Sequence, residues 1–191
     1  RYDSWRLNSP NDGVFHSNGS LYFTDPPYGL YGLLEDERKE LPFQGIYRLD
    51  PDGNLVLVDD AVSFPNGIGL SPDEMTLYVA VSDHDDAIWL AYDVQSDGSI
   101  ANRRVFFDAN EWAGTDDMPG YPDGMAVHSS GLVFATGPGG VWLFSPDGEP
   151  IARIVTGRAT ANCTLSTDQR LLFITANDTL MTLSIGEVHE Q

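Results

Sequence analysis

Amide and carboxylate side chains recur at the same position of a repeated sequence pattern. They are the residues of this chain best suited to chemistry. Each stands about ten residues before a leucine of a strand-like run, and together they are Asn11, Asn66, Asp123 and Asn162. Three of them precede Gly or Asp-Gly, in SPNDG, FPNGIGL and YPDGMAV. Such residues can make local Asx turns. Brought to a common axis, they instead form a ring of oxygen donors for a hard cation.

Four strand-like runs place these residues in phase and predict an all-β fold. Their aligned leucines are Leu21, Leu77, Leu132 and Leu172. A second strand pattern follows each run, and three of these patterns end in Asp-Gly, which is typical of a hairpin turn. Units of about 40 to 55 residues with several short strands indicate the blades of a β-propeller. In a propeller, the segment entering the inner strand of each blade lies at one mouth of the central channel.

About four blades can be counted in this chain. We therefore expect residues 1–191 to form a single β-propeller domain, and we expect its N-terminal blades to be missing from this sequence. The opening residues, RYDSWRLNSP, show no signal-peptide pattern. The compartment stays open, with the cytoplasm slightly favoured.

Charge and composition restrict the partners of the protein. Ten Lys and Arg against 29 Asp and Glu give 10 − 29 = −19, a charge that repels nucleic acid and anionic membranes. No apolar run approaches the ~20 residues that span a bilayer. The single cysteine, Cys163, excludes an internal disulfide and is interpreted as a small buried apolar residue.

The chain closely resembles the SMP-30/gluconolactonase/LRE-like family. The segments that carry the resemblance run from residue 7 to about 183 and are SPNDG…YFTDPPYG, FQGIYRLDPDG, FPNGIGLSPDEMTLYVA, PDGMAV, GPGGVWLFSPDG and ANCTL…LFITA. The resemblance implies a six-bladed propeller that hydrolyses sugar lactones with a divalent metal in its channel. The family's Glu-Gly-Pro metal-binding motif is not found in these 191 residues. Val81 also stands where many relatives have an acidic or amide residue.

The resemblance implies roles for three residues of the ring. Asn66 and Asp123 are expected to bind the metal, and Asn11 to contact the substrate beside it. Oxygen donors favour Ca²⁺, with Mg²⁺, Mn²⁺ or Zn²⁺ as alternatives. Asp123 is also the expected general base for lactone hydrolysis. Because a cation lowers the pKa of a carboxylate, Asp123 either leaves the metal to accept a proton or only orients the attacking water.

Two long inserts, residues 26–44 and 109–122, can overhang the channel mouth. Tyr28, Trp112 and Tyr121 within them could stack on a sugar ring or simply hold the loops in place. Two other functions stay open at this stage. One is a paraoxonase-like hydrolase of other lactones or organophosphates, and the other is a non-catalytic, calcium-binding propeller. The sequence does not indicate an oligomeric state.

Overall fold

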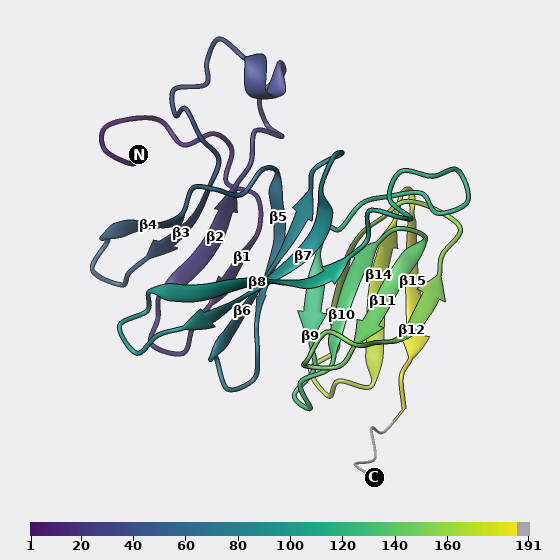
Figure 1. Ribbon diagram of the computed structural model, residues 1–191. Coiled ribbons are helices and arrows are strands. Elements are labelled where there is room, and N and C mark those ends of the chain that lie inside the picture. The colour runs from purple at the N-terminus through teal and green to yellow at the C-terminus, as the bar shows by residue number, and fades with distance from the viewer. Residues whose placement is uncertain (187–191) are drawn as a thin grey trace.

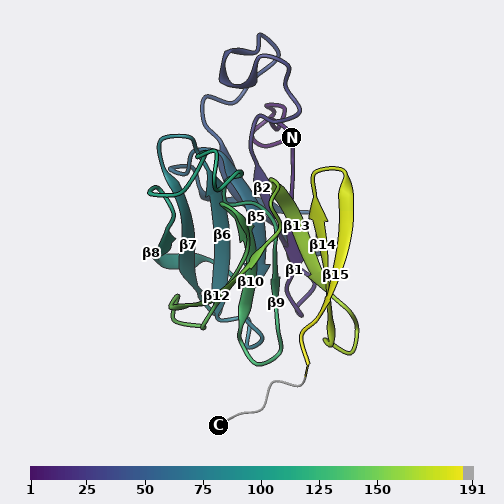
Figure 2. The ribbon, with the colours of Figure 1, turned by 90° about the vertical axis from the view of Figure 1, so that its right-hand side faces the viewer.

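The computed structural model describes residues 1–186, which form fifteen strands and one short 3₁₀ helix, η1 (Leu33–Glu35). The strands build four separate antiparallel sheets, and each sheet is a meander of consecutive strands. Figures 1 and 2 show the sheets standing side by side. The expectation of four propeller blades in an all-β chain is confirmed.

The bounds of the strands follow the repeats of the sequence. In the first blade they are β1 (Gly13–Phe15), β2 (Leu21–Asp25), β3 (Gly45–Leu49) and β4 (Leu55–Asp59). In the second they are β5 (Pro65–Leu70), β6 (Thr76–Ser82), β7 (Ala87–Val94) and β8 (Ile100–Asp108). In the third they are β9 (Met125–Val127), β10 (Val133–Gly137), β11 (Gly140–Phe144) and β12 (Pro150–Val155). The fourth has three described strands, β13 (Thr160–Leu165), β14 (Leu171–Ala176) and β15 (Thr179–Ser184).

The hydrophobic core consists of three layers, one between each pair of neighbouring blades. Tyr22 of the first blade meets Leu77 of the second in one layer. In the next layer Trp89 packs edge-on against Phe144, with 5.3 Å between ring centroids. Leu172 of the last blade belongs to the third layer, as does Cys163, whose predicted burial is confirmed. Side chains on both faces of the central strands are therefore buried, which fixes each blade against the next.

The strand register corrects one detail of the repeat alignment. The backbone N–H of Asn11 donates to the carbonyl of Thr24, and the N–H of Asp123 donates in the same way to Thr136. Leu21 and Val133 each stand three residues before one of these threonines, so they occupy equivalent positions in their blades. The buried residue that occupies the leucine position in the third blade is therefore Val133, and the predicted Leu132 is one residue too early, since β10 begins after it.

The two long inserts lie at the end of the sheets where the inner strands begin. The 26–44 segment, which contains η1, projects beyond the first blade (Figure 1). Among the described residues, no helix is long and apolar enough to cross a membrane.

Candidate active site

Residues at the start of the inner strands, or just before them, converge on one cavity of about 750 Å³. Asn11, Asn66, Asp123 and Asn162 all line it, one from each blade. Tyr28 and Tyr121 line it from the two inserts. Residues more than 150 positions apart in the sequence thus share one concave surface, as the propeller interpretation requires.

The glycines that follow Asn66 and Asp123 allow the blades to approach closely. A Cβ atom on Gly67 would lie 2.1 Å from the carbonyl oxygen of Asp123, and one on Gly124 would lie 2.2 Å from the Asn162 side chain. Neither glycine has a positive φ. Asn66 and Gly67 also lie within β5, so they do not form an Asx turn. These glycines are needed for space, since any side chain would push the next blade away from the axis.

Asn11 and Asn66 contact each other directly across the boundary between the first two blades. Asn11 Nδ2 donates to Asn66 Oδ1 at 2.5 Å, and Asn66 Nδ2 donates to Ser82 Oγ at 2.9 Å. The Thr24 hydroxyl donates to the Asn66 carbonyl at 2.7 Å. Asn66 is 8% exposed, so both ends of its amide are fixed by hydrogen bonds in a largely dry environment.

Asp123 is a partly buried carboxyl in a cavity without cationic partners. Burial, assisted by the nearby charge of Asp12, raises the pKa of Asp123 to about 7. Hydrogen bonds from the Gly124 backbone and the Asn66 side chain only partly offset this rise in pKa. No Lys, Arg or His is among the described residues that line the cavity. The site therefore concentrates negative charge that a bound cation would neutralise.

Asn162 faces the cavity, but it does not occupy the position of Asn11, Asn66 and Asp123. Asn162 pairs with Thr175, and its Oδ1 accepts the N–H of Cys163 at 2.8 Å. Asp12 makes the same contact with the N–H of Gly13 at 2.9 Å. The fourth-blade equivalent of the other three residues is Ala161, which has no donor atom in its side chain. The predicted residue Asn162 therefore faces the cavity but stands one position after the equivalent residue, because the turn between β13 and β14 is one residue longer than the turn between β1 and β2.

The two insert tyrosines are held at the cavity by different contacts. The Tyr28 hydroxyl donates to the Phe64 carbonyl at 3.3 Å, and burial raises the pKa of this phenol to about 12. The Tyr121 ring lies 5.7 Å from the His84 ring, and its hydroxyl packs over Gly114, where a Cβ would lie 2.2 Å away. Both tyrosines therefore line the cavity while contacts with neighbouring loops hold them in place.

Trp112, the third predicted aromatic contact, is not brought to this cavity. Its ring stacks on Phe107 at 5.8 Å with an interplanar angle of 5° and lies 5.3 Å from Trp142. It packs against the core layer between the second and third blades. The structure gives Trp112 the alternative role considered above, that of holding its loop in place.

Two cavity residues escaped the sequence analysis. Asp12 accepts the N–H of Ile68 at 3.1 Å and so joins the first two inner strands. Ser82, at the end of β6, bonds to Asn66. The extra acidic residue in Asn-Asp-Gly, compared with Asn-Gly, was a visible signal for Asp12. No sequence pattern marks Ser82, because its contacts come from a neighbouring strand.

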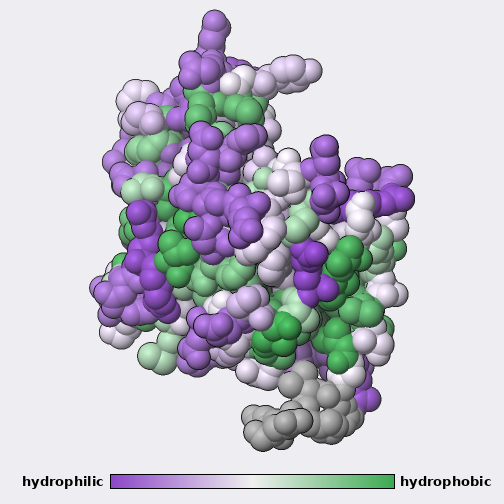
Figure 3. All heavy atoms as spheres, turned by 45° about the vertical axis from the view of Figure 1, so that its right-hand side comes forward, coloured by the Kyte–Doolittle hydropathy of each residue, from purple (hydrophilic) through white to green (hydrophobic). Residues whose placement is uncertain are grey.

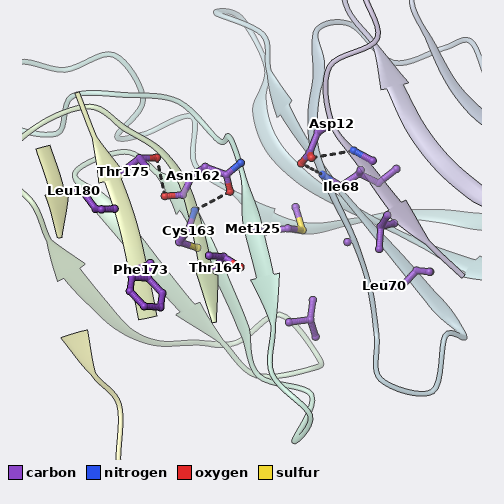
Figure 4. A pocket seen from close by; sticks show the side chains of 14 residues that line it. Asp12, Ile68, Leu70, Met125, Asn162, Cys163, Thr164, Phe173, Thr175 and Leu180 are labelled. Atoms are coloured by element: carbon purple, nitrogen blue, oxygen red, sulfur yellow. Dashed lines mark hydrogen bonds between the residues drawn. The ribbon is translucent and has the colours of Figure 1, made fainter. Parts of the chain in front are cut away.

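A second cavity, of about 550 Å³, continues the channel away from the mouth. Asp12 and Asn162 lie at the boundary between the two cavities, since both residues line both. Figure 4 shows them on opposite sides of the second cavity, with Leu70, Met125 and Phe173 along its walls. The residues that line the channel are therefore mostly polar types at the mouth and more often apolar types beyond this boundary.

No cluster of three or more His, Cys, Asp or Glu residues that could hold a metal ion occurs in the described part of the chain. The donors at the cavity are instead amides together with the carboxylates of Asp12 and Asp123. Oxygen donors of this kind match Ca²⁺ better than Zn²⁺.

The fold and the cavity define a β-propeller whose candidate site is built from the entrances of its inner strands. Residues 1–178 match the model of the SMP-30/Gluconolactonase/LRE-like region, and the chain belongs to this family. Its predicted family resemblance is therefore confirmed.

Relatives and solved structures agree with this assignment. The chain is 41% identical over 179 residues to a gluconolactonase of Zymomonas mobilis, covering 92% of this chain and 50% of that protein. A solved structure of a gluconolactonase from Xanthomonas campestris superposes with a TM-score of 0.80 at 36% identity, covering 96% of this chain and 59% of that one. Diisopropyl-fluorophosphatase of Loligo vulgaris is 29% identical over 154 residues, with 78% of this chain and 48% of that protein covered. The chain thus spans about half the length of the curated relatives it matches.

Proposed function

We propose that this protein hydrolyses a sugar lactone, such as gluconolactone, to the aldonic acid with the help of a divalent cation. The observation that carries the proposal is the convergence of Asn11, Asn66 and Asp123 on one cavity. Membership of the family and the similarity to named gluconolactonases support the choice of substrate.

The donor set of the cavity fits a cation. Asn66, through its Oδ1, and Asp123, through its carboxylate, would hold the ion, for which Ca²⁺ is the first choice. When bound, the cation would polarise the lactone carbonyl and lower the pKa of the attacking water. Two carboxylates without a cationic partner among the described lining residues support this assignment.

The remaining roles belong to side chains around the same cavity. Asn11 would hydrogen-bond to the lactone, while Tyr28 and Tyr121 would pack against the sugar ring. The Asp123 carboxylate would accept a proton from water as the water oxygen adds to the carbonyl carbon. The ring C–O bond then breaks, and a proton passes to the leaving ring oxygen. Such general-base assistance typically contributes 10²- to 10⁴-fold in rate.

The substitution Asp123→Asn tests this role. It keeps the size of the side chain and removes its charge, so gluconolactone turnover should fall by on the order of 10² or more in the full-length protein. Asp117→Asn, at an exposed carboxylate in the preceding loop, is the matched control and should keep full activity. Undiminished turnover of Asp123→Asn would contradict the proposal and favour a non-catalytic propeller. Organophosphate hydrolysis without lactonase activity would instead favour the paraoxonase-like alternative.

A further inference from the structure

Ser82 joins the entrances of two inner strands through one hydroxyl group. Its Oγ accepts a hydrogen bond from Asn66 Nδ2 at 2.9 Å and donates one to the carbonyl oxygen of Pro122. Its own backbone N–H is bonded to the carbonyl of Phe64 at 3.0 Å. The serine is therefore fixed within its own blade while its side chain reaches the next blade.

The number of hydrogens on this hydroxyl decides how the Asn66 amide is oriented. A hydroxyl carries one hydrogen, and a carbonyl oxygen can only accept, so that hydrogen points to Pro122. The atom of Asn66 that faces Ser82 must then be its NH₂ group. Asn66 Oδ1 consequently faces Asn11, whose Nδ2 lies 2.5 Å away at the cavity.

The same contact restrains the backbone next to Asp123. Pro122 directly precedes Asp123 and is itself buried. The Asp123 N–H is bonded to Thr136 at 2.9 Å within the third blade. The Ser82 hydroxyl on the Pro122 carbonyl adds a tie to the second blade, beside the contact of the Asn66 side chain with the Asp123 carboxylate. The same hydroxyl thus acts on the orientation of Asn66 and on its spacing from Asp123.

We infer that Ser82 is a positioning residue that keeps the Asn66 oxygen directed at the cation and holds Asn66 and Asp123 at a fixed separation. This inference rests on the proposed function, and it assigns the role to a residue that acts through others. Loss of a group that orients a metal ligand typically lowers metal affinity 10- to 100-fold.

The test measures Ca²⁺ binding by calorimetry on the chelator-stripped, full-length protein. Ser82→Ala should raise the Kd for Ca²⁺ by about 10-fold or more, and saturating Ca²⁺ should recover most of kcat. Ser82→Thr keeps the hydroxyl at a site that borders open space, and should restore most of the affinity. The binding measurement does not depend on catalysis.

Ser71→Ala is the matched control, since Ser71 lies in the same blade and is buried at 9% exposure. Its Oγ also makes two hydrogen bonds, with Asp73 at 2.5 Å and with the N–H of Thr76 at 2.9 Å. Ser71→Ala should lower Tm at least as much as Ser82→Ala and leave the Kd unchanged. An unchanged Kd for Ca²⁺ in Ser82→Ala, or an equal loss of Ca²⁺ affinity in Ser71→Ala, would overturn the inference about Ser82 and leave the proposed function standing. Wild-type protein that binds none of Ca²⁺, Mg²⁺, Mn²⁺ and Zn²⁺ would instead overturn the proposed function, and the inference with it.

Discussion

At the scale of single residues, burial without an ion pair distinguishes two carboxyl groups among the described residues. Asp123 faces the cavity, whereas Asp25 is fully buried at the end of β2. Asp25 Oδ2 accepts the N–H of Asn8 at 2.8 Å, and its Oδ1 has no hydrogen-bond partner among the described residues. Burial raises the pKa of Asp25 to about 6. A carboxyl buried in this way destabilises the fold in its charged form.

The shifted pKa of Asp25 predicts a pH-dependent stability. The folded protein binds this proton more tightly than the unfolded chain does, so stability falls as the pH rises from about 4 through about 6 and then levels off. The expected loss approaches 3 kcal/mol, from about 1.4 kcal/mol per pKa unit. Urea unfolding of wild type and Asp25→Asn between pH 4 and pH 7.5 measures it. The free energy of unfolding of the variant should rise relative to wild type across this range, and parallel curves would contradict the explanation.

At the scale of elements, threonine hydroxyls on two of the strands lie within hydrogen-bond distance of the next blade at the candidate site. Thr24 of β2 donates to the Asn66 carbonyl at 2.7 Å. The single hydrogen of the Thr136 hydroxyl, on β10, is shared between the Gly124 carbonyl of its own blade at 2.9 Å and the Ala161 carbonyl of the next blade at 3.1 Å. The equivalent residue of β6, Ala80, has no hydroxyl. Thr175 of β14 bonds to the carbonyl of Asn162 at 3.2 Å on an exposed face.

Removing the Thr24 hydroxyl should therefore destabilise the fold. Thr24→Val leaves the carbonyl of Asn66 and the N–H of Asp12 without their side-chain partner, which costs about 1–3 kcal/mol for buried groups. Thr175→Val is the control at the same position of another blade, and water can replace its bond. Its cost should stay within about 0.5 kcal/mol. Equal losses for the two variants in chemical denaturation would argue against a buried tie.

The blades could be predicted from the sequence repeats, because the residues that form a hairpin turn are neighbours in the sequence. The Asp-Gly pairs ending at Gly53, Gly98 and Gly148 form turns in which each glycine has a positive φ, as the sequence indicated. Turn chemistry could not explain why glycine is needed at Gly67 and Gly124, because the requirement there is the close approach of another blade. It also could not show that Ala161, and not Asn162, is the equivalent residue of the fourth blade, because the turn after the inner strand differs by one residue between blades.

At the scale of the whole molecule, the four blades are joined one to the next by their core layers, and the first and fourth share no comparable layer among the described residues. Apolar side chains such as Phe15, Leu180 and Val155 are more than half exposed. Figure 3 shows hydrophobic patches on one face of the molecule. The expectation that further blades precede this chain stays a prediction.

The net charge of −19 surrounds the cavity with a negative electrostatic field. A strongly acidic surface raises the local concentration of cations and repels anions. Such a field favours the entry of a divalent cation and the departure of an aldonate product. The charge of the whole chain is therefore consistent with the chemistry proposed for Asn66 and Asp123.

Metal removal tests the central claim most directly. Gluconolactone hydrolysis would be followed in the full-length protein as isolated, after stripping with a chelator, and during Ca²⁺ titration of the stripped protein. The account predicts that stripping abolishes turnover and that Ca²⁺ restores it along a saturable curve, while folding, followed by circular dichroism, persists throughout. Full turnover in the stripped protein would contradict the proposed metal-assisted mechanism.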